Sequence, residues 1–310
     1  MNRRHFIATT SLAAAASALA PRLAPAQGTG PASRRYWFAV KSGMINDPSA
    51  ATWEDKFKLL KDLGYDGIEF DSQYVASVKE AVAASEKSGL PVHGVVNANH
   101  WSVRLSDPSA DIRAKAVEEL RDAVRFSKAV GGSSVLLVPG AVRDAANENA
   151  EQVWTRSLEG IRQVLPLSAE LGINILIENV WNRFLYRHGD DAPSDQTADE
   201  IIRYLKEINS PWTGSYFDIG NHRKYGTPSA WARQLGSHIV KLDVKDFRLA
   251  KDSPDGKEKW SDIGEGSVDW EATRNVLAET GFYGWATAEV GGGNRERLAL
   301  ILQQMKKVLF

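Results

Sequence analysis

The feature that most constrains the fold of this chain is a short apolar run that ends on a carboxylate, and it occurs four times. The segment 174–178 ends on Glu178, and the other three runs end on Asp218, Asp243 and Glu289. Short apolar runs bounded by polar residues are typical of strands that are buried on both faces of a sheet. If the four strands are parallel members of one barrel, their acidic ends share the face where such barrels carry out chemistry.

Around these acidic strand ends, short apolar segments alternate regularly with longer amphipathic ones. Segments that predict strands lie at 36–40, 65–70, 91–97, 134–138, 174–178, 213–217, 239–242 and 284–288. Segments that predict helices follow them at 53–63, 75–88, 111–130, 151–171, 197–208, 229–235, 270–280 and 295–309. We expect an interruption of the fourth helix near Pro166, and we expect Thr52 and Gly64 to cap the first helix at its two ends. Strict alternation favours a parallel sheet with helices outside it.

Eight strand–helix units in roughly 280 residues are the number and size of an α/β fold of the (β/α)8 TIM-barrel type, here a single domain over residues 35–310. A doubly wound open sheet is the main alternative. No glycine-rich dinucleotide-binding fingerprint follows the first strand, which argues against a nucleotide-binding version of that alternative. The two longest loops, 182–196 and 247–268, follow strands five and seven, so they lie on the face that carries the acids.

The N-terminal residues predict export rather than folded structure. The pair Arg3-Arg4 precedes an alanine-rich, mildly apolar segment, and a small-residue cleavage site ends at Ala26. This pattern is typical of a twin-arginine-type signal peptide over residues 1–26, followed by a linker at 27–34. We therefore expect passage through the twin-arginine translocation (Tat) machinery, cleavage near Ala26 and a periplasmic protein. The apolar segment is short and interrupted, so stable membrane insertion is not expected.

Composition excludes several functional classes. The 310 residues contain 38 basic and 39 acidic side chains, and removal of residues 1–26 takes away three arginines and no acids, which leaves a net charge of −4. This balance, without a basic stripe, argues against a nucleic-acid partner. The chain has no cysteine, so disulfides, a thiolate nucleophile and thiolate metal ligands are excluded.

The four acids at the strand ends predict a metal site. Glu178, Asp218, Asp243 and Glu289 would repel one another if they converged without a cation, and some of them would have to take up protons. Hard divalent cations accept several carboxylate ligands, so a bound Mn²⁺ or Mg²⁺ resolves the conflict. The alternative is that one or two of these acids cap helices or pair with Lys241, Lys245 or Arg248.

Six short motifs stand at the expected strand ends and in the loops after them. They are Gly67-Ile68-Glu69, Ile177-Glu178-Asn179, Phe217-Asp218-Ile219-Gly220-Asn221, Val244-Lys245-Asp246, Gly264-Glu265-Gly266 before Trp270, and Gly281-Phe282-Tyr283-Gly284 before Glu289. In this order and spacing the motifs resemble the sugar phosphate isomerase/epimerase family, whose members have a xylose isomerase-like TIM barrel. The resemblance covers the chain from Tyr36 to the C-terminus.

The resemblance implies roles for the four acids. The metal ligands of the family are Glu, Asp, His and Glu at the ends of strands five to eight, which correspond to Glu178, Asp218, Asp243 and Glu289. The third position departs from the family, because this chain has an aspartate where a histidine is usual. An aspartate can still bind a hard metal, with one more negative charge and a different geometry.

The resemblance also implies a reaction. In the family's epimerases a metal ion holds a ketone and the neighbouring hydroxyl oxygen, one glutamate removes the proton from the carbon beside the carbonyl, and another returns it on the opposite face. Glu178 and Glu289 correspond to this catalytic pair. We therefore expect an exported, metal-dependent isomerase or epimerase that acts on a sugar or keto-sugar. No phosphate-binding motif is evident, so an unphosphorylated substrate is favoured.

Other polar and aromatic residues on the same face are candidates for substrate binding. Those whose side chains we expect to contact the sugar are Glu69, His100, Trp101, Asn182, Asn221, His222 and Arg248. Trp181 is a second aromatic residue that could stack on a sugar ring, although aromatic residues are as often packing residues. His93 lies within a strand and is expected to be a core histidine.

Three alternative functions stay open in the sequence. A carbanion that expels a leaving group from the next carbon would make the enzyme a keto-sugar lyase, because proton abstraction is common to both reactions. The changed third ligand, Asp243, also suits a periplasmic sugar-binding barrel without catalysis. A metal-dependent phosphodiester nuclease on the same barrel is the third alternative, and the acidic charge argues against it.

Overall fold

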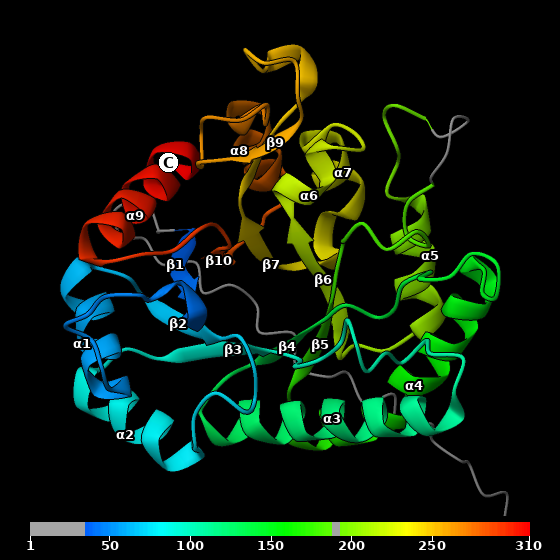
Figure 1. The fold of residues 1–310 in the computed structure, drawn as a ribbon, viewed down its shortest axis with the longest axis horizontal. Coiled ribbons are helices and arrows are strands. Elements are labelled where there is room, and N and C mark those ends of the chain that lie inside the picture. Colours follow the sequence, from blue (N-terminus) through cyan, green and yellow to red (C-terminus); the bar gives the residue numbers. More distant parts are fainter. Residues whose placement is uncertain (1–34, 188–192) are drawn as a thin grey trace, which may run out of the picture. The chain divides into compact units, whose positions relative to one another are not determined.

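A closed barrel of eight parallel strands organises the chain, as the computed structural model shows for residues 35–187 and 193–310 (Figure 1). The strands are β1 Tyr36–Lys41, β2 Gly67–Phe70, β3 Val92–Val96, β4 Ser134–Leu137, β5 Asn174–Glu178, β6 Thr213–Asp218, β7 Ile239–Val244 and β10 Gly284–Ala288. They pair in the order β1-β10-β7-β6-β5-β4-β3-β2, and β1 pairs with β2 to close the ring. The predicted TIM barrel is confirmed.

The helices alternate with the strands along the chain and lie outside the ring (Figure 1). They are α1 Trp53–Leu63, α2 Val78–Ser88, α3 Ala110–Ala129, α4 Ala150–Leu171, α5 Asp199–Ile208, α6 Ile219–Arg223, α7 Pro228–Leu235, α8 Trp270–Glu279 and α9 Arg295–Leu309. The first and last of them, α1 and α9, pack against each other and so complete the outer layer. All eight predicted helices are present, and α6 is an additional short one.

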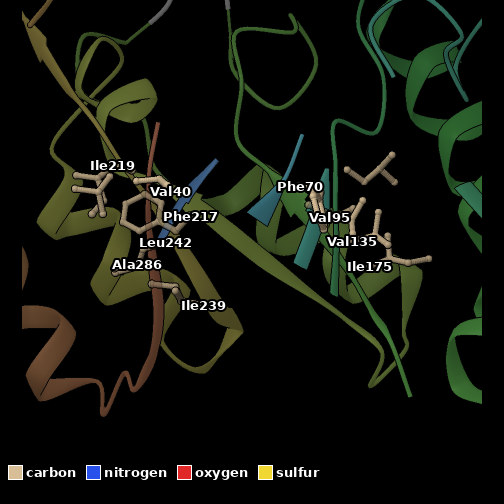
Figure 2. Close-up of a cluster of buried hydrophobic side chains, with 14 of the residues drawn as sticks. Val40, Phe70, Val95, Val135, Ile175, Phe217, Ile219, Ile239, Leu242 and Ala286 are labelled. Atoms are coloured by element: carbon tan, nitrogen blue, oxygen red, sulfur yellow. The ribbon is translucent and has the colours of Figure 1, made fainter. Parts of the chain in front are cut away.

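Apolar side chains form a large layer outside the barrel wall and a small cluster inside it. Successive side chains of a strand point to opposite faces, so Phe217 of β6 packs outward against the helices while Tyr216 points into the barrel. Figure 2 shows part of the outer layer, where Val40 and Leu242 lie close to Phe217. The inner cluster is small, with Leu136 and Leu176 beside Tyr216. The rest of the barrel interior is therefore left to polar side chains.

Local signals set the helix ends. Thr52 caps α1 through a capping box, and Gly64 ends this helix in the left-handed conformation at φ 89°, as predicted. Helix α4 runs without a break through Pro166, so the expected interruption is wrong. Ile161 and Val164 bury the inner face of α4 at that point, and their packing outweighs the one backbone hydrogen bond that a proline removes.

The segment after β7 contains a hairpin where the sequence predicted an open loop. Strands β8 Asp246–Arg248 and β9 Lys259–Ser261 pair antiparallel. The buried carboxylate of Asp246 holds the base of this hairpin, because it accepts hydrogen bonds from the Gly264 N–H at 3.1 Å and the Trp270 indole N–H at 2.8 Å. Each strand has three residues, which is too few for a two-residue period to be visible in the sequence.

The remaining topological expectations concern membranes and the N-terminus. Within residues 35–187 and 193–310, no helix combines the length and the apolar character that crossing a bilayer requires. The predicted signal peptide and linker, residues 1–34, lie outside the described residues. Residues 35–310 form one compact unit.

Candidate active site and metal centre

The four predicted acids meet at the carboxyl ends of neighbouring strands. Glu178 ends β5, Asp218 ends β6, Asp243 lies one residue before the end of β7, and Glu289 directly follows β10. Each acid offers one oxygen, and these oxygens all lie within 4.8 Å of one another. Asp218 and Asp243 are fully buried, whereas the side chain of Glu289 is 31% exposed. The barrel therefore gathers charges that lie more than a hundred residues apart in the sequence.

Strand geometry explains why these acids face the barrel interior. In β7 the side chains of Leu242 and Val244 belong to the outer apolar layer, so Asp243 between them points inward. In β6 the outward Phe217 alternates in the same way with Asp218. The register of the two strands places Asp218 directly beside Asp243.

The buried Lys41 and the largely buried Lys245 compensate part of the negative charge. Lys41 ends β1, and its Nζ lies 3.0 Å from Asp243 Oδ2 and 2.9 Å from Glu289 Oε1. Lys245 Nζ lies 2.8 Å from Asp218 Oδ2 and also pairs with Glu289. Pairing with Lys245 was the alternative expected for one or two of the acids. Lys41 was missed, although a charged residue that ends an apolar strand is the signal that singled out the acids.

The charges and free oxygens of the four acids suit one divalent cation in addition to the two lysines. The four acids carry four negative charges when ionised, and Lys41 and Lys245 carry two positive ones, so two negative charges are left over. Asp243 Oδ1 is buried without a hydrogen-bond partner among the described residues, and Asp218 Oδ2 has only its ion pair with Lys245. Converging carboxylate oxygens are ligands that Mg²⁺ and Mn²⁺ accept.

Burial and neighbouring charges separate the pKa values of the acids. Burial, reinforced by the charge of Glu289, raises the pKa of Glu178 well above its ordinary value. Burial also raises the pKa of Asp218, to about 6. Burial opposes the ionisation of Glu289 as well, yet Lys41 and Lys245 together hold its pKa below the ordinary value. Without metal, the protein therefore holds an ionised Glu289 beside carboxyl groups that favour the protonated form.

Metal binding is expected to stabilise the protein more at higher pH. Between about pH 4 and pH 6, the range over which burial shifts the pKa of Asp218, this carboxyl group holds protons in the metal-free folded state that it has lost in the unfolded chain, so its contribution to stability falls as the pH rises. A divalent cation must displace these protons and binds better once they are gone. Saturating Mn²⁺ is expected to raise Tm by roughly 3 °C more at pH 7 than at pH 5 in scanning fluorimetry. Equal increases at both pH values would contradict this linkage.

A cavity of about 400 Å³ adjoins the acids, and Glu178 and Glu289 line it. Of the predicted substrate-binding residues, His100, Trp101 and Asn221 line this cavity, as does Trp181. Asp71 also lines it and was missed by the sequence analysis. The signal that could have found it was present, because Asp71 directly follows β2 as Glu289 follows β10.

His100 is fixed as a neutral hydrogen-bond donor. Its Nδ1 accepts a hydrogen bond from the backbone N–H of Val138 at 3.2 Å, so the neutral ring carries its proton on Nε2. Burial lowers the pKa of His100 to about 3, and Lys41 adds to this effect. The ring therefore stays uncharged at neutral pH and has an N–H for a ligand oxygen.

Four predicted substrate-binding residues lie outside this cavity. Glu69 is fully buried inside the barrel, and Asn182 lines a separate neighbouring cavity. His222 is fully buried and stacks on Trp231, with ring centroids 3.9 Å apart. Arg248 donates a hydrogen bond to a backbone carbonyl in the loop after β9. The structure thus brings three of the seven candidates together with the acids and separates the other four from that cavity.

Helix α6 explains why Asn221 faces the cavity and His222 does not. Asp218 caps this helix by accepting a hydrogen bond from the Asn221 N–H at 2.7 Å. Successive helical residues are rotated by about 100° around the axis, so the two adjacent side chains diverge. The Asn221 amide donates to Glu178 Oε1 at 3.3 Å, and its backbone carbonyl accepts the Trp181 indole N–H at 2.9 Å. Asn221 therefore connects a carboxylate of the site to an aromatic wall.

A hydrogen-bonded layer lies beneath the acids, inside the barrel. This inner polar layer consists of the buried side chains of Glu69, His93, Tyr216, Lys241 and Thr287. Lys241 donates to the His93 carbonyl at 2.6 Å, and the Thr287 hydroxyl lies 3.1 Å from His93 Nε2 and 2.9 Å from the Tyr216 hydroxyl. Tyr216 in turn donates to Glu69 at 3.0 Å. His93 is therefore a buried histidine with partners, as predicted, and Glu69 supports the floor of the site.

Comparison with known proteins assigns the family. A family model described as the xylose isomerase-like TIM barrel matches residues 57–308. The chain is 24% identical over 256 residues to the L-ribulose-5-phosphate 3-epimerase UlaE of Salmonella paratyphi A, and the match covers 76% of this chain and 81% of that protein.

Solved structures share the fold. The 3-keto-D-glucoside 4-epimerase YcjR from E. coli superposes with a TM-score of 0.69 at 14% identity, covering 88% of this chain and 98% of that one. The D-allulose 3-epimerase from Methylomonas sp. superposes with a TM-score of 0.67 at 19% identity, covering 88% and 97%. Since the family model spans most of the barrel, the resemblance seen in the motifs is confirmed, and this chain belongs to the xylose isomerase-like TIM-barrel family.

Proposed function

We propose that the chain is a metal-dependent isomerase or epimerase of a sugar that carries a ketone, and that it works by proton abstraction beside the carbonyl. The observation that carries this proposal is the convergence of four carboxylate oxygens within 4.8 Å beside a polar cavity of about 400 Å³. The names of similar proteins, an L-ribulose-5-phosphate 3-epimerase and a D-allulose 3-epimerase, support the reaction class.

The metal ligands in this proposal are Glu178, Asp218, Asp243 and Glu289. A bound divalent cation, Mn²⁺ or Mg²⁺, supplies Lewis-acid stabilisation of the negative charge that develops on the carbonyl oxygen when the neighbouring carbon loses a proton. Asp243 supplies the oxygen that replaces the usual histidine nitrogen, and Lys41 offsets its additional charge at 3.0 Å.

The side chains of the site divide the proton transfer between them. Glu289 lines the cavity and is held ionised by two ammonium groups, so its carboxylate accepts the proton from the carbon beside the carbonyl. Glu178 lines the same cavity and is the second acid–base group, which returns a proton to this carbon. His100 donates from Nε2 to a sugar oxygen, and Trp101 contacts the apolar face of the ring.

Solvent hydrogen exchange tests this proposal. The Mn²⁺-loaded protein is incubated with D-allulose, D-tagatose or L-ribulose in D₂O, and deuterium beside the carbonyl is followed by NMR. We expect exchange into at least one ketose, reduced at least ~100-fold by removal of the metal with EDTA and restored by Mn²⁺. Sugar binding without deuterium uptake would point to a sugar-binding barrel, and release of an unsaturated product would point to a lyase. Either result would contradict an epimerase.

We also propose that the protein is exported to the periplasm through the Tat machinery. The pair Arg3-Arg4 and the small-residue site that ends at Ala26 support this proposal. Replacement of both arginines by lysine in the full chain is expected to leave most of the protein as an uncleaved cytoplasmic precursor in a Tat-competent bacterium. Fractionation and immunoblotting measure this, and unchanged export would contradict the proposal.

A further inference from the structure

A second cavity, of about 430 Å³, adjoins the cavity beside the acids. Trp101 and Trp181 line both of them, so the two spaces share a wall of aromatic side chains. This outer cavity is as large as the one that contains Glu178 and Glu289, at about 400 Å³. The two cavities together have roughly twice the volume of the catalytic cavity alone.

The outer cavity has a buried hydrogen-bond donor without a partner. Asn182 lines it and is 1% exposed, and its side-chain Nδ2 has no hydrogen-bond partner among the described residues. Its Oδ1 accepts the Leu185 N–H at 3.4 Å, which orients the amide. A buried N–H without a partner costs desolvation free energy. A ligand oxygen that accepts a hydrogen bond from it would recover this cost and favour binding.

Two arginines add further donors around the same cavity. Arg143 lies 5.5 Å over the Trp101 ring and donates to the Trp101 carbonyl at 2.8 Å, so it is held at the boundary of the two cavities. Arg183 also lines the outer cavity, and no acid within residues 35–187 and 193–310 forms an ion pair with it. Its backbone is left-handed at φ 61°, which is uncommon for a bulky residue and is often found at ligand sites.

A third cavity, of about 550 Å³, meets the site on another side, where Lys245 and Glu289 line both spaces. Its charged groups already have partners. Arg297 forms a two-point ion pair with Asp262 at 2.8 and 2.6 Å, and the Asp246 carboxylate accepts several N–H groups of its own loop. The outer cavity differs because the Asn182 Nδ2 donor and the Arg183 guanidinium have no hydrogen-bond or ion-pair partner among residues 35–187 and 193–310.

From these observations we propose that the substrate is a keto-sugar of disaccharide size, whose second ring lies in the outer cavity between Trp101, Asn182 and Arg183. The proposal rests on the proposed function for the chemistry of the first ring, and it names the substrate class. Sugar rings combine an apolar face with many hydroxyl oxygens, which matches aromatic walls with amide and guanidinium donors. No additional reaction step is required, because the second ring is bound and not transformed.

Calorimetric titration of the Mn²⁺-loaded full chain tests this substrate class. D-fructose is compared with maltulose and isomaltulose, two disaccharides that contain a fructose unit with a free ketone. At least one disaccharide is expected to bind roughly tenfold tighter than D-fructose. The double variant Arg143→Ala/Arg183→Ala, and separately Asn182→Ala, are expected to lose this additional affinity. Arg125→Ala is the matched control, because Arg125 is an exposed arginine on α3 that pairs with Asp122.

Equal affinity for D-fructose and both disaccharides would overturn the proposal, as would an advantage that persists in both variants or an absence of binding by all three sugars. Solvent deuterium exchange separates this failure from a failure of the proposed function. Exchange into ketose monosaccharides, without tighter binding of either disaccharide, would support the epimerase proposal and contradict the outer subsite. If disaccharides bind tightly through Asn182 and the two arginines but no exchange occurs, the outer subsite is supported and the epimerase proposal is contradicted.

Discussion

Glu178→Gln is expected to reduce solvent hydrogen exchange at least ~10³-fold and to lower the metal content of the purified protein well below one ion per chain. A glutamine offers one neutral oxygen where the carboxylate offers charge, so the site loses an anionic ligand. It also cannot hold and return a proton. Because Glu178 accepts the Asn221 amide at 3.3 Å, a glutamine that keeps its oxygen there can preserve the local packing.

Elemental analysis and exchange rates, measured on the same preparations, check this result. Glu289→Gln is expected to reduce exchange by a similar factor, because Glu289 lines the same cavity and is the ionised member of the pair. Glu118→Gln provides the matched control, since Glu118 is 61% exposed on α3. Full metal content together with normal exchange in Glu178→Gln would refute the carboxylate site.

Lys41→Met is expected to raise the affinity for Mn²⁺ at least tenfold. The ammonium of Lys41 lies 3.0 Å from Asp243 and 2.9 Å from Glu289, so it repels a dication and occupies two of its ligands. Burial opposes the charge of Lys41, but Asp243 and the neighbouring acids raise its pKa well above the ordinary value, so it stays charged. Near a protein surface, two unit charges at 4 Å interact by about 4 kcal/mol, and about 1.4 kcal/mol is already tenfold.

Methionine has a similar length and no charge, so the substitution removes the ammonium and keeps most of the packing. Electron paramagnetic resonance of free Mn²⁺ measures the dissociation constant. The metal-free variant is expected to melt at a lower temperature than the wild type, because its acids lose a counter-charge. Lys115→Met, at an exposed position, controls for loss of a lysine elsewhere. Unchanged or weaker Mn²⁺ binding by Lys41→Met would show that Lys41 does not compete with the metal.

Much of the barrel could be predicted because each strand is a short apolar run and each helix an amphipathic segment, and both patterns are visible in a short stretch of sequence. The four acids could be found for the same reason, since each ends an apolar run and parallel strands bring their ends to one face. The helix through Pro166 was mistaken because burial of Ile161 and Val164 is a tertiary effect that a local proline rule does not include.

The missed and misplaced residues have physical explanations as well. His222 follows Asp218 closely in the sequence, but one step along α6 rotates its side chain away from the cavity and against Trp231. Arg248 lies in a hairpin strand of three residues, which is too short to have a recognisable period. The role of Lys41 could not be recognised from the sequence, because its partner Glu289 is 248 positions away and approaches it only when β1 pairs with β10.

The inner polar layer has a consequence for how the chain folds. Its five side chains come from β2, β3, β6, β7 and β10, so neither the first half of the barrel nor the second can satisfy them alone. A half-barrel of β1 to β4 would bury Glu69 and His93 without Tyr216, Lys241 and Thr287, and each unpaired buried group costs about 1–3 kcal/mol. This cost raises the free energy of partly assembled barrels relative to the closed one. We therefore expect the two halves of the barrel to fold together, in one cooperative step that closes the ring.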